Sequence, residues 1–532
     1  MSQLDYNNML VAELKQELES FSLPTSGKKS ELIERLITHS KEPVMISIEA
    51  DLIDEESRYD MIISRMKTQV IGPLNIGAVI AILLSVLMIS TVLIIQPSWL
   101  GFGDDYDYEL IDFEQSQTKL YAEELVALGH PDWEGRMSGT VEEANTSLYI
   151  LDRLSDMGYE ARSYSYEVPM HHVNSEPSFR LCVQGSLGFS PCDGPLGQVG
   201  GSQVTIFQHR VDYVIQGLSG QSEYMFDEDI TVTDLGNGTD EALWQSATGT
   251  LGYVRMDESR VSNTQMYSYA AQNDLAGIIS VNKIINCGQI EGNDCVPIFK
   301  GTNYDALVSA NGGTIPTDIP FIAMSRDSGD IFEALVINAT EPASIELIID
   351  VTNDEERTIY VPCGIIEGRS SEVIIAGAHH DTVYQGEGAV DDTSGVTTVL
   401  EMARQLAEIV NNTGMPERTI QFCTWGGEEE GLWGSRAYVA EMQSSLRNNL
   451  RLYLNFDMNH VDADFQNRGN SLTLFTNNED DYGHIKRIAN LYTEERNEIA
   501  NKYDIRFSLL DGAKGESNEM PCNSDYCPFI YE

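Results

Sequence analysis

The chain has few basic residues for its length, and this scarcity restricts the partners that its surface can attract. Lysine and arginine together number 33, against 83 aspartate and glutamate residues, which gives a formal net charge of −50 over 532 residues. This excess argues against a nucleic-acid partner for the bulk of the chain, favours a strongly solvated surface and would suit a saline environment. A glycine-rich phosphate loop and the Ser-His-Asp order of serine hydrolases are also absent, so the chemistry has to come from other residues.

Long apolar runs are scarce, and one of them stands out as long enough to cross a membrane. Residues 74–95 carry no charge and are mostly apolar, as in a bilayer-spanning helix. The run begins too far from the N-terminus for a cleaved secretory signal. Basic side chains precede it and acidic ones follow: Arg58, Arg65 and Lys67 before, and Asp104, Asp105, Asp107, Glu109, Asp112 and Glu114 after. The positive-inside rule therefore predicts a single-pass type II protein of the cell membrane, with a cytoplasmic N-terminus and an extracellular C-terminal part.

Cysteine is absent before residue 182, so all eight cysteines follow the apolar run. Three pairs are close enough in sequence to close small loops in an oxidising exterior. These pairs are Cys182/Cys192, Cys287/Cys295 and Cys522/Cys527. Cys363 and Cys423 lie in apolar, strand-like contexts, and we expect them to be buried thiols.

Short apolar runs separated by amphipathic stretches predict an α/β fold. Residues 373–378, 419–424 and 450–456 resemble strands that are buried on both faces of a parallel sheet. Helical patterns follow over residues 396–409 and 432–442. This alternation predicts a mainly parallel sheet flanked by helices, with ligands bound beyond the carboxyl ends of the strands.

Acidic side chains and one histidine occupy those strand ends and a nearby glycine-rich loop. Carboxylate and imidazole groups suit zinc, and a shared carboxylate can hold two ions close together. We expect Asp391 to bridge two zinc ions. His379 and Asp457 would complete one site, and Glu429 would hold the other ion.

Two further acidic residues have the positions of proton-transfer and orienting groups. Glu428, beside the ligand Glu429, would take a proton from water and deliver it to the leaving amine. Asp381, two residues after His379, would orient that imidazole. Glu430 is expected to face solvent at a helix start, where negative charge is favourable. Taken alone, each of these patterns is more often an ordinary solvated surface.

Together the motifs resemble the di-zinc aminopeptidase family, which also contains glutamate carboxypeptidases and the inactive transferrin receptor. They read Gly377-Ala378-His379-His380-Asp381, Asp391-Asp392-Thr393-Ser394-Gly395, Glu428 to Ser435, and Asn455-Phe456-Asp457, with a weaker match at Gly135 to Thr140. The resemblance extends over about residues 116–532. It implies the zinc exopeptidase fold, two zinc ions and a peptide substrate, and it implies that His379 rather than His380 is the ligand.

One ligand that the family uses for its second metal is missing from the given sequence. The family's Ser-Asp-Tyr-x-Pro-Phe motif is present as residues 524–529, and a final histidine normally follows it. No histidine occurs after His484, which lies in a predicted surface helix over residues 480–499. We expect the protein to continue beyond Glu532, because a sheet that ended there would have an unpaired apolar edge. The alternative is a catalytically inactive receptor or scaffold on the same fold.

Residues 202–349 form a long insertion between the weaker motif and the metal motifs. Strand-like runs at 250–255, 277–281 and 319–324 and a helical pattern at 264–273 make it resemble the protease-associated domain of this family. That domain commonly covers the active site and helps to select substrates.

The N-terminal residues resemble the SAP motif, a helix-extended-helix unit often associated with DNA. Residues 10–36 read LVAELKQELESFSLPTSGKKSELIERL, in which Lys28, Lys29 and Arg35 could contact phosphates. Nearby glutamates leave the unit almost neutral, so a protein-interaction or spacer unit is an equal alternative. A tether between DNA and the membrane is a further one.

These patterns predict a membrane-anchored zinc exopeptidase of the aminopeptidase type, with carboxypeptidase or glutaminyl cyclase chemistry as alternatives. A homodimer is a further expectation for its assembly. The predicted divisions are a SAP-like unit at 1–42, a linker at 43–73, a transmembrane helix at 74–96, a linker at 97–115, a peptidase domain at 116–201 and 350–532, and the insertion at 202–349.

Overall fold

The computed structural model describes residues 14–15, 18, 25–26, 28–30, 32–33, 69–71, 74–75, 111–183, 203–228, 230–256, 261–282, 297, 299, 301–339, 343–459, 471–496 and 504–531. The chain divides into two units, Met1–Asp107 and Tyr108–Glu532. In the first unit Leu14, Leu18 and Leu32 are buried. Its short strands β1 (Gln69–Ile71) and β2 (Leu74–Asn75) pair antiparallel.

Within the described residues no helix has the length and apolar character needed to cross a membrane. The predicted span over residues 74–95 lies outside those residues apart from β2, so the membrane arrangement stays a prediction.

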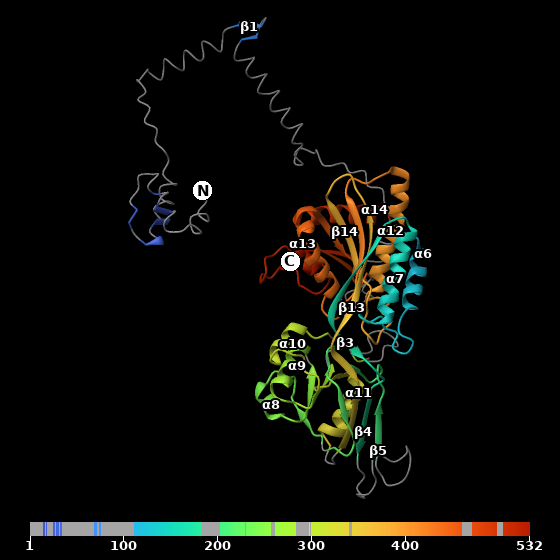
Figure 1. Ribbon diagram of the computed structural model, residues 1–532, viewed down its shortest axis with the longest axis vertical. Helices are drawn as coiled ribbons and strands as arrows, with labels where there is room; N and C mark the ends of the chain where they lie inside the picture. Colours follow the sequence, from blue (N-terminus) through green and yellow to red (C-terminus); the bar gives the residue numbers. More distant parts are fainter. Residues whose placement is uncertain are drawn as a thin grey trace. The chain divides into compact units, whose positions relative to one another are not determined.

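The second unit contains a first lobe built on one five-stranded sheet (Figure 1). Its order is β16-β14-β15-β13-β3. The strands are β3 (Glu160–Val173), β13 (Val351–Ile366), β14 (Val373–His379), β15 (Thr419–Trp425) and β16 (Leu450–Asn455). The last three confirm the strands predicted from the apolar runs.

The sheet is mixed, which corrects the expectation of a mainly parallel one. Strand β14 is parallel to both β15 and β16, whereas β13 is antiparallel to both β15 and β3. Helices cover both faces, and the buried part of β13 over residues 359–365 is apolar like its parallel neighbours, so its sequence pattern does not reveal its direction.

Helices pack on the two faces of this sheet through separate apolar clusters. Helices α6 (Gln115–Val126), α7 (Val141–Asp156) and α12 (Thr393–Thr413) share one cluster with β14 and β15. Helix α13 (Trp433–Asn449) packs on the other face, where Tyr438 lies against Trp425. The remaining elements of the lobe are β17 (Ser471–Thr476), α14 (Glu479–Glu495), β18 (Asp504–Leu509) and α16 (Tyr526–Tyr531).

A disulfide joins Cys363 to Cys423, which corrects the expectation of two buried thiols. The two residues are direct partners in the antiparallel register of β13 and β15, with Cα atoms 4.1 Å apart. That register is not visible in the sequence. The predicted Cys522–Cys527 disulfide is confirmed. Cys182 is also disulfide-bonded, and the other predicted pairing partners lie outside the described residues.

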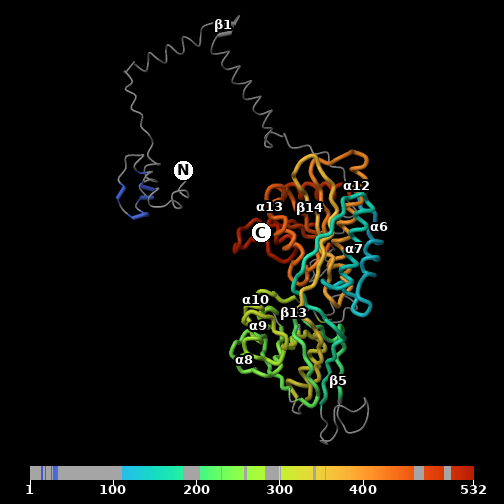
Figure 2. The backbone as a smooth tube through the Cα atoms, in the orientation of Figure 1, coloured from blue at the N-terminus to red at the C-terminus, as the bar shows by residue number. Residues whose placement is uncertain are grey.

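The chain leaves the first lobe along β3, forms a second lobe and returns along β13 (Figure 2). The second lobe has two sheets, of order β6-β11-β10-β9-β8 and β5-β4-β12-β7. Its strands are β4 (Ser178–Val183), β5 (Gln203–Phe207), β6 (Tyr213–Ile215), β7 (Ser222–Tyr224), β8 (Val232–Asp234), β9 (Leu251–Met256), β10 (Gly277–Asn282), β11 (Phe321–Met324) and β12 (Ala343–Ile349). Its helices are α8 (Glu241–Ser246), α9 (Asn263–Gln272), α10 (Tyr304–Ala310), α11 (Arg326–Phe332) and the π-helix η2 (Glu333–Ile337). The predicted strands and helix of this region are confirmed as β9, β10, β11 and α9.

Replacement of Leu400 by alanine should destabilise the protein by about 2–5 kcal/mol, because it leaves a cavity in a fully buried cluster. The free energy of unfolding can be measured by urea denaturation. Leu148→Ala, at a side chain 58% exposed on α7, is the matched control and should change this free energy by about 0.5 kcal/mol or less. Equal effects of the two substitutions would contradict the packing described here.

Candidate metal centre

The predicted ligands lie at one edge of the sheet because their strands are parallel neighbours. His379 is the last residue of β14, and Asp457 lies two residues after the end of β16. Glu428 lies three residues after the end of β15. Since the carboxyl ends of parallel strands meet at the same edge, these side chains come together as predicted.

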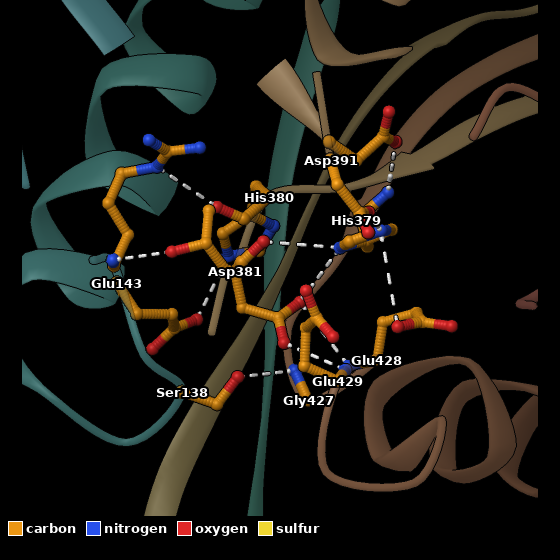
Figure 3. Close-up of polar contacts among 12 residues, drawn as sticks. Ser138, Glu143, His379, His380, Asp381, Asp391, Gly427, Glu428 and Glu429 are labelled. Carbon is orange, nitrogen blue, oxygen red and sulfur yellow. Dashed lines mark hydrogen bonds and ion pairs between the residues drawn. The ribbon is translucent and has the colours of Figure 1, made fainter. Parts of the chain in front are cut away.

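Three of the predicted ligands, His379, Asp391 and Asp457, form a compact group, and Figure 3 shows the first two side by side. His379 Nε2 lies 3.0 Å from Asp391 Oδ1 and 3.9 Å from Asp457 Oδ1. One ligand atom from each of these residues lies within 4.8 Å of the others. Glu428 Oε2 is 4.0 Å from the same nitrogen. Glu429, the fourth predicted ligand, is outside the three-residue group.

The tautomer of His379 follows from its second nitrogen. Nδ1 lies 3.1 Å from the main-chain oxygen of Asp381, which can only accept a hydrogen bond. Nδ1 therefore carries a proton, and Nε2, which lies 3.0 Å from Asp391 Oδ1, is the nitrogen that a cation would bind in place of a proton. The main chain of Asp381 thus orients this imidazole, while its carboxylate Oδ1 is 3.6 Å away.

The carboxylate of Asp381 is bound to the loop that carries the proposed proton-transfer residue. Its two oxygens accept hydrogen bonds from the amides of Glu428 and Glu429, at 3.3 and 3.2 Å. Asp381 is fully buried. It therefore links the loop after β14 to the loop after β15, which is a wider role than the sequence predicted.

Asp392 links the end of β14 to the start of α12 and to the segment after β16. The sequence alone assigned no role to this residue. Its Oδ2 accepts from the amide of His379 at 3.3 Å, and its Oδ1 accepts from the amides of Gly395 and Met458 at 2.9 and 3.0 Å. Burial, and then the neighbouring Asp457, raise the pKa of Asp392 well above its usual value. The sequence signal was its position as the N-cap of α12.

Glu430 corrects a prediction, because its carboxylate is not directed to solvent. Both carboxylate oxygens are buried and have no hydrogen-bond partner among the described residues. Burial, and then Asp381 and Glu429, raise the pKa of Glu430 well above its usual value. A run of three glutamates gives no indication of which member points inward.

The charges at this edge make it a fitting site for a cation. Burial alone would lower the pKa of His379, but Glu428, Asp381, Asp391 and Asp392 outweigh it and raise that pKa well above its usual value. Burial and the nearby Asp391 raise the pKa of Glu429 to about 8. Both shifts show that negative charge is crowded here, and a zinc ion bound to these oxygen and nitrogen donors would neutralise it.

Residues far away in sequence support the segment after β14. Arg136 is fully buried and donates through its side chain to the main-chain oxygens of His380 and Glu387 and to the hydroxyl of Thr393. Burial lowers its pKa to about 10. The weaker match at Gly135 to Thr140 was the only sequence signal for this residue.

His380 points away from the metal group, as expected for a neighbour of the ligand. Because successive side chains of a strand alternate in direction, His379 and Asp381 share one side and His380 faces α7. Its Nε2 lies 2.9 Å from Glu143 Oε1, and both side chains are fully buried (Figure 3). Nothing in the sequence indicated this pair.

The second lobe contacts two of the loops at this edge. The hydroxyl of Tyr384, in the loop after β14, lies 2.8 Å from His209 Nε2. At the end of the loop after β15, the ring of Trp433, the first residue of α13, packs edge-on against Tyr304 of α10, with ring centres 5.8 Å apart. The second lobe therefore helps to hold the metal-binding edge.

Of the predicted phosphate-contacting residues, Lys28 and Lys29 lie in the first unit and Arg35 lies outside the described residues.

Two regions of the chain match known protein families. Residues 363–530 match Peptidase family M28, and residues 5–41 match the SAP domain. The chain is 29% identical over 212 residues to an aminopeptidase of Pseudomonas aeruginosa, covering 40% of this chain and 35% of that protein. It is 37% identical over 125 residues to an aminopeptidase of Mus musculus, covering 23% and 16%. The chain thus spans about a third or less of the length of these relatives.

Solved structures show the fold. A zinc aminopeptidase from Bacillus subtilis matches with a TM-score of 0.53 at 17% identity, covering 79% of this chain and 84% of that one. A peptidase M28 precursor from Shewanella amazonensis matches with a TM-score of 0.50 at 17% identity, covering 78% and 84%. The second unit therefore has an α/β aminopeptidase-like fold with mixed sheets.

Without metal, Glu429→Gln should become more stable than the parent chain as the pH rises from about 4.5 to about 8. The pKa of Glu429 is about 8 in the folded protein, above its ordinary value of 4.5. Between these two values the folded parent keeps a proton that the unfolded chain releases, so the parent's free energy of unfolding falls as the pH rises toward 8. Glutamine has no such ionisation. Melting temperatures of the chelator-treated proteins across this range measure the difference. Glu223→Gln, on the exposed part of β7, is the control, and a difference independent of pH would contradict the prediction.

Proposed function

We propose that this chain, which carries an M28 peptidase region over residues 363–530 and a SAP domain over residues 5–41, is a zinc-dependent aminopeptidase. The observation that carries the proposal is the group formed by His379, Asp391 and Asp457 at the carboxyl ends of parallel strands. Its substrate class would be peptides with a free N-terminal amine, which the acidic edge of the sheet would attract.

The donor set allows the ligands to be assigned to two zinc ions. His379 and Asp457 would hold one ion, Glu429 would hold the other, and Asp391 would be shared. When bound, zinc would polarise the scissile carbonyl and make a water more acidic.

The chain's own residues supply proton transfer and orientation. Glu428 lies beside the ligand group, with its side chain 12% exposed and Oε2 4.0 Å from His379 Nε2. It is the carboxylate that we assign to take a proton from water and give it to the leaving amine. Asp381 holds the amide of Glu428 and orients His379 through its main-chain oxygen. Glu428 and Asp381 would therefore have different roles, the first in proton transfer and the second in orientation.

Glu428→Gln should lower kcat for hydrolysis of an amino-acid p-nitroanilide by about 10²–10⁴-fold, because the proton acceptor is removed while the ligands remain. Initial rates with zinc-loaded protein and zinc content by mass spectrometry measure the two effects separately. Glu223→Gln should leave both unchanged. An active parent whose Glu428→Gln variant is equally active would contradict the role of Glu428, and an inactive zinc-loaded parent would favour the receptor or scaffold alternative.

We also propose that the SAP domain binds DNA, a second function that the match over residues 5–41 favours. The domain carries adjacent lysines, Lys28 and Lys29, which can contact phosphates. Its glutamates weaken the attraction, so the expected binding is weak and strongly dependent on salt.

Binding of the parent full chain to a duplex should weaken steeply as salt is added, and substitution of both Lys28 and Lys29 by glutamate should abolish this binding. Fluorescence anisotropy at several salt concentrations measures both. Lys119→Glu, at a lysine side chain 75% exposed on α6, is the control. Binding that survives the double substitution would place any DNA contact elsewhere.

Membrane anchoring by residues 74–96 remains part of the proposal. It is supported by the charge-free run and by the change of charge sign across it. In this arrangement the N-terminus would be cytoplasmic and the peptidase region extracellular. The homodimer likewise stays a prediction.

A further inference from the structure

A line of hydrogen-bonded side chains leads from the core of the sheet to Asp457. Tyr453, Asn455 and Asp457 alternate with their neighbours along β16 and its extension, so they share one side of the strand. Trp425, the last residue of β15, and Ser524, in the loop before α16, lie on that same side and complete the line.

Each member of the line gives a hydrogen bond to the next. Trp425 Nε1 donates to Tyr453 Oη at 2.9 Å, and that hydroxyl donates to Asn455 Oδ1 at 2.8 Å. Asn455 Nδ2 donates to Ser524 Oγ at 2.8 Å, and Ser524 Oγ donates to Asp457 Oδ2 at 2.5 Å.

The chemistry of the two ends fixes this direction. An indole N–H can only donate, and an ionised carboxylate can only accept. All four bonds therefore point toward Asp457, and aligned bonds of this kind polarise one another and strengthen the last one.

The surrounding structure holds the line rigidly. Trp425 is fully buried and Ser524 is 4% exposed. The ring of Tyr453 stacks on Phe529 of α16, with ring centres 4.0 Å apart. The Cys522–Cys527 disulfide closes the short loop that contains Ser524.

The last bond divides the two oxygens of Asp457 between different partners. Oδ2 is occupied by Ser524, whereas Oδ1 is the oxygen that lies 3.9 Å from His379 Nε2. A carboxylate held in this way presents a single oxygen to a cation beside the imidazole.

We propose that Ser524 is a positioning residue that holds Asp457 Oδ2 and so leaves Oδ1 facing the place where zinc would bind beside His379, with Asn455, Tyr453 and Trp425 supporting the Ser524 hydroxyl. The inference rests on the metal site of the proposed function. Residues that hold a metal's ligands in place typically contribute 10–100-fold to metal affinity.

The test compares zinc dissociation constants of the full chain, measured by competition with a chromophoric chelator. Ser524→Ala should weaken zinc binding by about 10–100-fold. The same substitution should change the unfolding equilibrium constant of the metal-free protein by a smaller factor. Ser524→Thr keeps the hydroxyl and should restore the parent affinity. Ser280→Ala removes a fully buried serine hydroxyl in β10 of the second lobe and should leave zinc binding unchanged.

A second variant keeps the test decisive if Ser524→Ala fails to fold. Tyr453→Phe retains the stacked ring, removes the hydroxyl in the middle of the line and should weaken zinc binding less than Ser524→Ala. A folded Ser524→Ala, or in its absence Tyr453→Phe, that binds zinc as tightly as the parent overturns the inference. Equal losses in Ser524→Ala and Ser524→Thr also overturn it. Failure of the parent itself to bind zinc is a different result, because it overturns the proposed metal site as well.

Discussion

The crowding of carboxylates around one buried imidazole, at the ends of three parallel strands, is the constraint on which this structure depends. Negative groups brought together away from water repel one another and lose solvation. Asp381 and Asp392 offset this by accepting main-chain N–H groups from the loops around them. Asp391 and Asp457 instead direct oxygens toward His379. The inner carboxylates thus fix the loops, and the outer ones remain available to a cation.

This constraint explains why supporting residues come from every part of the second unit. Arg136 enters from the segment before α7 and binds main-chain oxygens on either side of the site. Glu143 reaches from α7 to His380, and Ser524 reaches from the loop before α16 to Asp457. The strands place the ligands, while these distant side chains set the direction in which each ligand points.

Local patterns predicted much of this arrangement. Apolar runs located β14, β15 and β16, and the same patterns placed α12, α13 and α9, because each reflects burial of the element itself. They did not reveal the antiparallel direction of β13, since its buried residues 359–365 would be apolar in either direction. The Cys363–Cys423 disulfide and the inward carboxylate of Glu430 depend on register and loop conformation, which adjacent residues do not encode. The Glu143–His380 pair spans 237 positions and has no local signal.

The central claim is that the strand ends bind zinc through His379, Asp391 and Asp457. Anomalous diffraction at the zinc absorption edge, from crystals of the full chain grown with zinc, tests this most directly. We expect an anomalous peak within ligand distance of His379 Nε2, Asp391 and Asp457 Oδ1. Well-ordered side chains at these positions without such a peak, or a peak confined to other residues, would contradict it.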